Sequence, residues 1–211
     1  MRKLITLLCV SLTFFAFSIY AGSKTSVQTI NANKYKEQTI VWAGIDCSKV
    51  TMYGTEGFNN PEDIISRYPE EWNTLFLKER LKKISKIFKK DLVVDISSVQ
   101  ENNKTLSSKQ IIAQDGKELL NKSDITPEII AEMVSGYEFK EKEGLGVVFI
   151  LDRLVKSEAR GSLFIVFFDL SSKEILATNH TIEKAGGFGF RNYWFSIVKN
   201  SESNLKKYYK K

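Results

Sequence analysis

The sequence predicts a single α+β domain, a largely antiparallel sheet with helices packed on it, in the order β-α-β-α-β-β-β-α. Three observations support this prediction. Apolar residues recur every three or four positions in residues 69–90, which is the period of an amphipathic helix. β-Branched and aromatic runs dominate residues 145–182, with no helical segment between them. The chain shows no internal repeat and no second set of such elements, so we expect one core.

The first half of the domain is predicted to begin with a strand at residues 39–45, which are β-branched and aromatic. Pro69 and the two acids after it begin a helix that continues to Lys90. We interpret its many lysines as a solvated face; binding to an anionic membrane or polymer is the alternative. The apolar stripe of this helix comprises Trp72, Leu75, Phe76, Leu81, Ile84, Ile87 and Phe88. The remaining segments are predicted as a loop at 53–61, a strand at 91–97, a loop at 100–110 and a short helix at 111–120.

The second half is predicted to be rich in strands. Thr126 caps a helix that continues to Tyr137, with Pro127 in its first turn. The long apolar run within 145–155 is typical of a buried central strand. The other elements are strands at 162–169 and 174–182, joined by a short turn, and a helix at 191–208 with Trp194, Ile197 and Val198 on its core face.

The first 21 residues have the three parts of a cleavable secretory signal. Arg2 and Lys3 precede an uncharged apolar run from Leu4 to Phe17, and the small Ala21 suits the cleavage position. The run is shorter than the roughly 20 residues that span a bilayer, although an uncleaved anchor or a buried helix is the alternative. We therefore divide the chain into a signal peptide (1–21), a flexible leader (22–38) and one domain (39–211). We expect the mature protein to be periplasmic or secreted, with no integral membrane span after cleavage.

Charge and cysteine content narrow the classes of partner and fold. The net charge is +6 and falls to +4 without the two basic residues of the signal, a mild excess that does not indicate a nucleic-acid-binding protein. Only Cys47 remains after cleavage, so no disulfide can form within the mature chain. We interpret Cys47 as a small buried residue; a reactive thiol or an intermolecular bridge is the alternative.

Residues for catalysis or metal binding are scarce. His180 is the only histidine, and with one mature cysteine it cannot build an ordinary transition-metal site, so we predict no metal, no cofactor and no catalytic residue. Asp46, Asp95, Asp152 and Asp169 each lie in or at the end of a predicted strand. We expect them to cap turns, and the alternative is that they converge in a cation site or a glycosidase-like pair.

A glycine-rich segment between the last strand and the last helix is the candidate site. Three interpretations are open: a tight crossing with Phe188 and Phe190 in the core, an anion site built from backbone amides, and an exposed aromatic patch for a partner. The spacing matches neither the P-loop nor the dinucleotide-binding pattern. The residues of this candidate ligand or partner patch are Lys184, Gly186, Gly187, Phe188, Gly189, Arg191 and Trp194.

Two stretches resemble a group of bacterial envelope domains. One leads from the helix at 126–137 through Gly144-Leu145-Gly146 into Val147-Val148-Phe149-Ile150, and the other follows the strand at 164–168 as Asp169-Leu170-Ser171-Ser172-Lys173-Glu174-Ile175-Leu176. The group comprises the curli secretion channel subunit, the amino-terminal domain of the Tol propeller protein and the lipoprotein activators of peptidoglycan synthases. Unlike the lipoproteins, this chain lacks a lipidation cysteine, and it lacks the long insertion of a channel subunit. The resemblance implies a fold alone.

The segment 184–194 also resembles secreted or periplasmic Bacteroidetes proteins, a resemblance that implies no activity. Together these observations predict an exported, non-enzymatic domain that binds another cell-envelope component, either an envelope protein or a second copy of itself. The alternative is a small anionic-ligand binder or a hydrolase that uses the Gly186–Arg191 loop and the strand-end aspartates.

Overall fold

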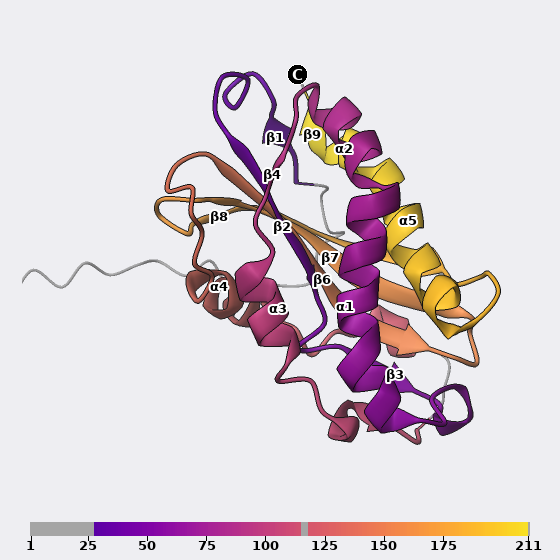
Figure 1. Ribbon diagram of the computed structural model, residues 1–211. Helices are drawn as coiled ribbons and strands as arrows, with labels where there is room; N and C mark the ends of the chain where they lie inside the picture. Colours follow the sequence, from indigo (N-terminus) through magenta and orange to yellow (C-terminus); the bar gives the residue numbers. More distant parts are fainter. Residues whose placement is uncertain (1–27, 115–117, 211) are drawn as a thin grey trace, which may run out of the picture.

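The computed structural model describes residues 28–114 and 118–210 (Figure 1). The predicted signal peptide and the first residues of the predicted leader, 22–27, lie outside these ranges. Within them, no helix combines the length and the apolar character that crossing a membrane requires. The described chain forms one α+β domain, which confirms the predicted fold class.

A mixed sheet forms the middle of the domain, with β6 at its centre. One edge of β6 pairs with β2 and then with β3, and its other edge pairs with β7, which pairs with β8. β4 extends the sheet beyond β2, and β5 extends it beyond β3. Its strands are β2 (Ile40–Asp46), β3 (Thr51–Tyr53), β4 (Val93–Val94), β5 (Ile111–Ile112), β6 (Leu145–Val155), β7 (Arg160–Asp169) and β8 (Ile175–Lys184). A separate pair joins β1 (Ile30–Asn31) to β9 (Tyr209–Lys210).

The prediction of a largely antiparallel sheet is wrong. β6, β7 and β8 form antiparallel hairpins as expected, but β2, β3, β4 and β5 all pair in parallel. Strands that follow one another directly in the chain can turn back through short connections. β2 and β6 are instead separated by a long helical stretch, which brings the chain back to the same end of the sheet before it enters β6.

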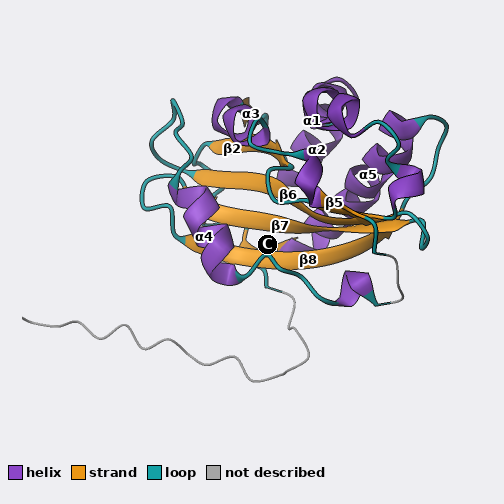
Figure 2. Cartoon of the chain, turned by 90° about the horizontal axis from the view of Figure 1, so that it is seen from below, coloured by secondary structure: helices purple, strands orange, loops and turns teal. Residues whose placement is uncertain are grey.

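Helices cover both faces of this sheet. Figure 2 shows α1, α2 and α5 on one face and α4 on the other, and α3 lies along the edge of β2. The larger apolar core therefore lies under α1, α2 and α5, and a second core lies under α4. The helices are α1 (Pro61–Glu79), α2 (Leu81–Phe88), α3 (Ser97–Asn103), α4 (Pro127–Ser135) and α5 (Phe190–Tyr208), with short 3₁₀ turns at Thr55–Gly57, Ser108–Gln110 and Leu119–Asn121.

Several predicted boundaries differ from the structure. The first helix begins at Pro61 rather than Pro69, and it is interrupted at Arg80, where α2 begins. Only two residues of the predicted strand at 91–97 pair with the sheet, because Ser97 already starts α3. That helix occupies the start of the predicted loop at 100–110. Of the predicted short helix at 111–120, residues 115–117 lie outside the described ranges, and the described part contains β5 and the start of a 3₁₀ turn instead of a helix.

The described part of the predicted leader belongs to the folded domain. Ile30 and Tyr35 are buried, and β1 pairs with β9 at the other end of the chain. Gln28 also exchanges hydrogen bonds with Asn179 on β8, at 3.0 and 2.9 Å. Residues 28–38 are therefore packed, and the domain starts earlier than the predicted residue 39.

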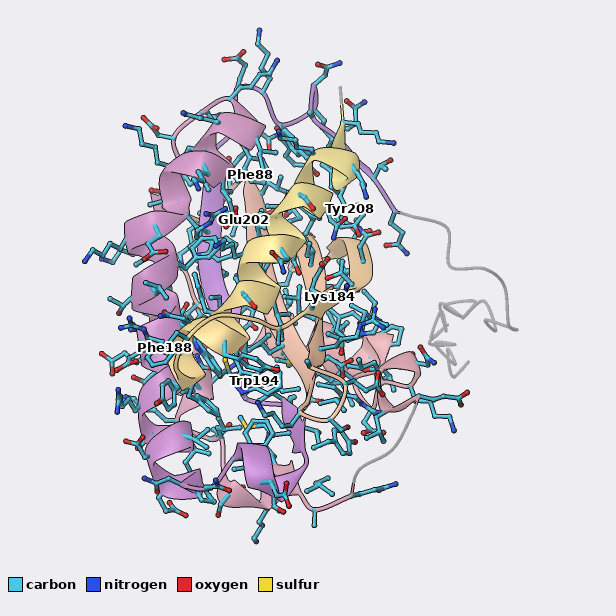
Figure 3. The ribbon with its side chains drawn as sticks, turned by 90° about the vertical axis from the view of Figure 1, so that its right-hand side faces the viewer. Phe88, Lys184, Phe188, Trp194, Glu202 and Tyr208 are labelled. Atoms are coloured by element: carbon cyan, nitrogen blue, oxygen red, sulfur yellow. The ribbon has the colours of Figure 1, made fainter. Side chains whose placement is uncertain are left out.

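A buried ion pair joins the two long helices. Arg80, at the interruption between α1 and α2, donates from Nε and Nη2 to the two carboxylate oxygens of Glu202 on α5. The side chains are only 11% and 7% exposed, so solvent screens the pair little. Figure 3 shows Glu202 midway along α5, on the side that lies against the purple helices. The pair therefore fixes the spacing of α5 relative to the α1–α2 junction.

We expect Glu202→Gln to lower the free energy of unfolding by about 3 kcal/mol, because it leaves the Arg80 guanidinium buried without a counter-charge. Urea denaturation measures this change. The double variant Arg80→Met/Glu202→Leu should recover most of the loss, since both charges are then removed together. Equal stability of Glu202→Gln and the unmodified protein would show that the pair contributes nothing.

Candidate functional site

The predicted glycine segment connects β8 to α5 and is held by its own hydrogen bonds. The Gly186 N–H donates to Tyr193 O at 3.2 Å and to Ser196 Oγ at 2.8 Å. Asn192 Nδ2 donates to the carbonyl oxygen of Phe188 at 3.2 Å. Gly187 has a φ of 121°, a conformation that a side chain would strain. The loop is therefore fixed, and the Gly186 amide is already used within it.

The three aromatic residues of this segment have different environments. Phe188 is 95% exposed, the most exposed of the large apolar side chains in the described residues, and Figure 3 shows it at the amino-terminal end of α5. Phe190 contacts the rings of Phe58 and Tyr68, at centroid distances of 5.8 and 4.5 Å. Trp194 is 2% exposed and stacks on Phe58. The expectation that Phe188 and Phe190 both lie in the core is therefore right for Phe190 and wrong for Phe188.

Basic side chains lie at the ends of the loop that carries Phe188 and on the turn beside it. Lys184 and Arg191, at the two ends of the loop, are both exposed. The turn between β6 and β7 lies beside the loop, since Ala185 N–H donates to Ala159 O at 2.8 Å. From this turn, Lys156 Nζ lies 4.2 Å from the centre of the Tyr193 ring. We call Lys156, Lys184, Phe188, Arg191 and Tyr193 the Phe188 surface.

The end of β2 carries a buried polar network that the sequence did not reveal. Asn73 of α1 exchanges two hydrogen bonds with the backbone of Ile45, at 2.8 and 2.9 Å, as a neighbouring strand would. Asn103 of α3 donates to Ile45 O and accepts from Cys47 N–H. These asparagines pair backbone groups that no strand reaches after β4 ends. One feature of the sequence could have indicated this network: Asn73 lies among the apolar residues of the first helix, where a polar side chain needs hydrogen-bond partners.

Asp46 is fully buried within the same network. Its Oδ1 accepts from the N–H and hydroxyl of Ser48, at 2.8 and 2.6 Å. Its Oδ2 accepts from the Tyr137 hydroxyl at 2.8 Å and from Asn102 at 3.2 Å. Burial, and secondly the negative charge of Asp46, raise the pKa of Tyr137 well above its ordinary value. The Tyr137 hydroxyl therefore stays protonated and donates its hydrogen bond. Each carboxylate oxygen of Asp46 accepts two hydrogen bonds.

Asp152 is the centre of a second hydrogen-bonded cluster, which includes His180, the only histidine of the sequence. It accepts hydrogen bonds of 2.8 Å from the Ser123 and Ser162 hydroxyls, and His180 Nε2 lies 2.8 Å from its Oδ2. Ser162 therefore bonds to the aspartate and not to the histidine. A catalytic triad requires the histidine between the serine and the acid. The arrangement is that of a structural cluster.

The predicted strand-end aspartates cap local structure instead of converging. Asp95 accepts from Ser97 Oγ and Lys140 N–H, and Asp169 accepts from the backbone and hydroxyl of Ser171. Across residues 28–114 and 118–210, no three histidine, cysteine or acidic residues are grouped so that they could hold a metal ion. Asp46, Asp95 and Asp169 thus act as turn and loop caps, whereas Asp152 lies within β6 and links it to β7 and β8.

Cys47 is a buried thiol. It is 0% exposed, and burial, and secondly the charge of Asp46, raise its pKa well above the ordinary value. A protonated, inaccessible thiol is a poor nucleophile. Its side chain belongs to the core beneath α1 and α5, whereas His180 packs against Phe164 of the opposite core. A pairing of Cys47 with His180 is therefore not formed.

A groove of about 570 Å³ lies between α1 and α3, beside the end of β2. Its floor includes Ile65, Pro69 and Leu106, and Asn103 lines it while making the bonds described above. Lys104 on its rim is paired with Glu101 at 2.6 Å. None of the buried polar atoms that lack a partner in the described chain belongs to a residue lining this groove.

Removing the Tyr137 hydroxyl tests the network at the end of β2. We expect Tyr137→Phe to lower the free energy of unfolding by about 1–3 kcal/mol, because Asp46 loses its closest donor on Oδ2. Tyr68→Phe is the matched control, since Tyr68 is also buried but its ring packs against Trp72 and Phe190 and its hydroxyl does not bond to Asp46. Equal losses in the two variants, measured by urea denaturation, would contradict the assignment.

A pH series tests the Asp169 cap. The hydrogen bond from the Ser171 hydroxyl is the main cause that lowers the pKa of Asp169 in the folded protein. This carboxylate therefore stabilises the fold above pH about 4, its unfolded pKa, and the contribution is lost as the pH falls through the lowered value. Asp169→Asn should make the decline of stability between pH 4 and 2 shallower. Ser171→Ala, which removes the hydroxyl that mainly lowers this pKa, should change the decline in the same direction, and an unchanged decline in both variants would contradict the assignment.

Comparison of the chain with protein-family models, curated proteins and solved structures gave no match. The resemblance to bacterial envelope domains therefore stays a prediction.

Proposed function

We propose that the mature chain is an exported, non-enzymatic domain that binds another component of the cell envelope through the Phe188 surface. The observation that carries this proposal is the position of Phe188: its ring is 95% exposed on a loop that internal hydrogen bonds fix. Binding would occur in the periplasm or after secretion, as the predicted signal peptide implies.

The energetics of Phe188 support a contact role. Burying a phenylalanine side chain stabilises a protein by roughly 1.5–3 kcal/mol. Phe188 does not contribute this energy, although Phe190, two residues further on, is partly buried against the core. An isolated exposed apolar residue is ordinary. Here, however, internal hydrogen bonds hold the backbone of the loop in place, so little backbone conformational entropy is lost when a partner covers the ring.

The charges beside Phe188 indicate the chemistry of the partner. Lys184 and Arg191 lie at the two ends of the loop that carries the ring, and Lys156 lies on the neighbouring turn over Tyr193. A complementary surface would therefore have an apolar recess with acidic groups near it. Aromatic and arginine side chains are the usual anchors of protein interfaces. Either an acidic envelope protein or an acidic surface of a second copy would satisfy this description.

The buried polar clusters favour binding over catalysis. Asp46 accepts four hydrogen bonds, Asp152 makes three with Ser123, Ser162 and His180, and the thiol of Cys47 is inaccessible and protonated. These groups offer no free base or nucleophile. A small anion at the glycine loop is less well supported, because the Gly186 amide donates within the protein.

Photocrosslinking from position 188 tests the proposal. A benzoylphenylalanine at 188, in the full chain expressed in its native host, should give a discrete adduct that is absent when the same group replaces Glu132 on the opposite face. Cell fractionation of the same culture should place the adduct in the envelope or the medium. A dimer formed by purified protein alone would identify self-association.

Phe188→Ala should weaken partner binding about thirtyfold, the scale of a hot-spot residue, while the melting temperature stays unchanged. Ile112→Ala, which truncates another exposed apolar side chain on β5, is the matched control. Equal adducts from positions 188 and 132 would contradict the proposal. So would a phosphate-induced rise in melting temperature that is lost in Arg191→Ala, since it would indicate a small anionic ligand.

A further inference from the structure

Besides the groove between α1 and α3, the protein has a hollow near the carboxyl-terminal end of α5, whereas the Phe188 surface lies at the amino-terminal end of that helix. Figure 3 shows Phe88 and Tyr208 at this end, far from Phe188. The hollow has a volume of about 340 Å³, within the range of small-molecule sites. It is formed where the start of the domain, the end of α2 and β9 meet, and is lined by Ala32, Asn33, Lys36, Ile87, Phe88, Lys89 and Tyr209.

The floor of this hollow is apolar and rigid. Phe88 and Tyr209 are 4% and 9% exposed, and their rings meet edge to face with centroids 4.7 Å apart. The Tyr209 hydroxyl donates to Ala32 O at 3.3 Å, and Ala32 N–H donates to Lys210 O at 2.6 Å. The floor is thus held from both ends of the chain, and an apolar ligand would meet preformed aromatic walls.

The rim of the hollow is positively charged. Lys36 and Lys89 line it, and no acidic residue does. Lys36 lies 3.5 Å from Glu37, but these side chains are 77% and 86% exposed, so solvent weakens the pair. Lys90 Nζ donates to the carbonyl oxygen of Lys36 at 2.9 Å, which fixes the backbone of this wall.

The position of Lys89 is informative. It ends α2 with a φ of 59°, the left-handed conformation for which glycine is the favoured residue. A lysine here has a backbone cost but supplies a cation at the mouth of the hollow. Substitution by glycine therefore removes the charge without opposing the local fold, which makes it a clean test.

We propose that this hollow binds a free amphipathic carboxylate, an acid with an unbranched apolar chain. The apolar chain would lie on Phe88 and Tyr209, and the carboxylate would be paired with Lys36 and Lys89. The site is independent of the Phe188 surface and does not rest on the function proposed above.

Isothermal titration of the purified protein with decanoate, below its micelle concentration, tests the site. We expect saturable binding with one molecule per chain, no comparable binding of decylamine, and weaker binding of decanol. Lys89→Gly and Lys36→Gln should each weaken decanoate binding about tenfold. Lys82→Gln and Lys83→Gln, exposed on the same α2, carry the same charge change and should have no effect.

Several results would overturn the proposal. Equal affinity for decanoate and decylamine would exclude recognition of the anion. Equal weakening by the rim and control lysine variants would show general attraction to the lysine-rich helix. Binding to vesicles of phosphatidylglycerol but not to decanoate would identify a membrane surface instead of a free acid. Phe188→Ala should leave decanoate binding intact, so this test can fail without affecting the partner proposal.

Discussion

The complete burial of β6 constrains the rest of the molecule. All 11 of its residues are buried, so each of its backbone groups needs a partner within the protein. β7 pairs with one edge along nearly the whole strand, and β2 and β3 divide the other edge between them. A strand that is buried on both faces needs helices above and below the sheet. α1, α2 and α5 cover one face and form the larger core, and α4 covers the other face and forms the second core.

The short reach of the neighbouring strands explains the polar network at the end of β2. β4 covers only two residues of β2, so the backbone at Ile45 and Cys47 would be left unpaired inside the domain. Asn73 and Asn103 provide those hydrogen bonds from helices instead. Asp46 and Asp152 are also buried polar groups, and several hydrogen-bond donors from the protein converge on each carboxylate. These bonds offset the cost of burying the two side chains. In both clusters the carboxylate oxygens already accept hydrogen bonds from within the fold.

The two candidate binding features lie at opposite ends of α5. At its start Phe188 stays outside the core on a loop that has Lys184 and Arg191 at its ends, and Lys156 of the neighbouring turn lies over Tyr193. At its end β9 closes an aromatic hollow with a basic rim. The ion pair between Arg80 and Glu202 holds the helix between them. Both features combine apolar surface with positive charge, so anionic partners suit each of them, through separate contacts.

The sequence by itself determined the α+β class, the helix that Thr126 and Pro127 begin, the three strands of the second half and the final helix. These elements follow from the spacing of apolar residues along the chain, which indicates the buried face of each element, and from the residues that cap the helices. It also pointed to the loop around Phe188 as the place to examine. Only the tertiary structure decided that the first strands pair in parallel with β6, that Phe190 is inside while Phe188 is outside, and that residues 28–38 pack against the far end of the chain. The physical reason is that strand partners and core membership depend on contacts between distant segments, about which a local pattern carries no information.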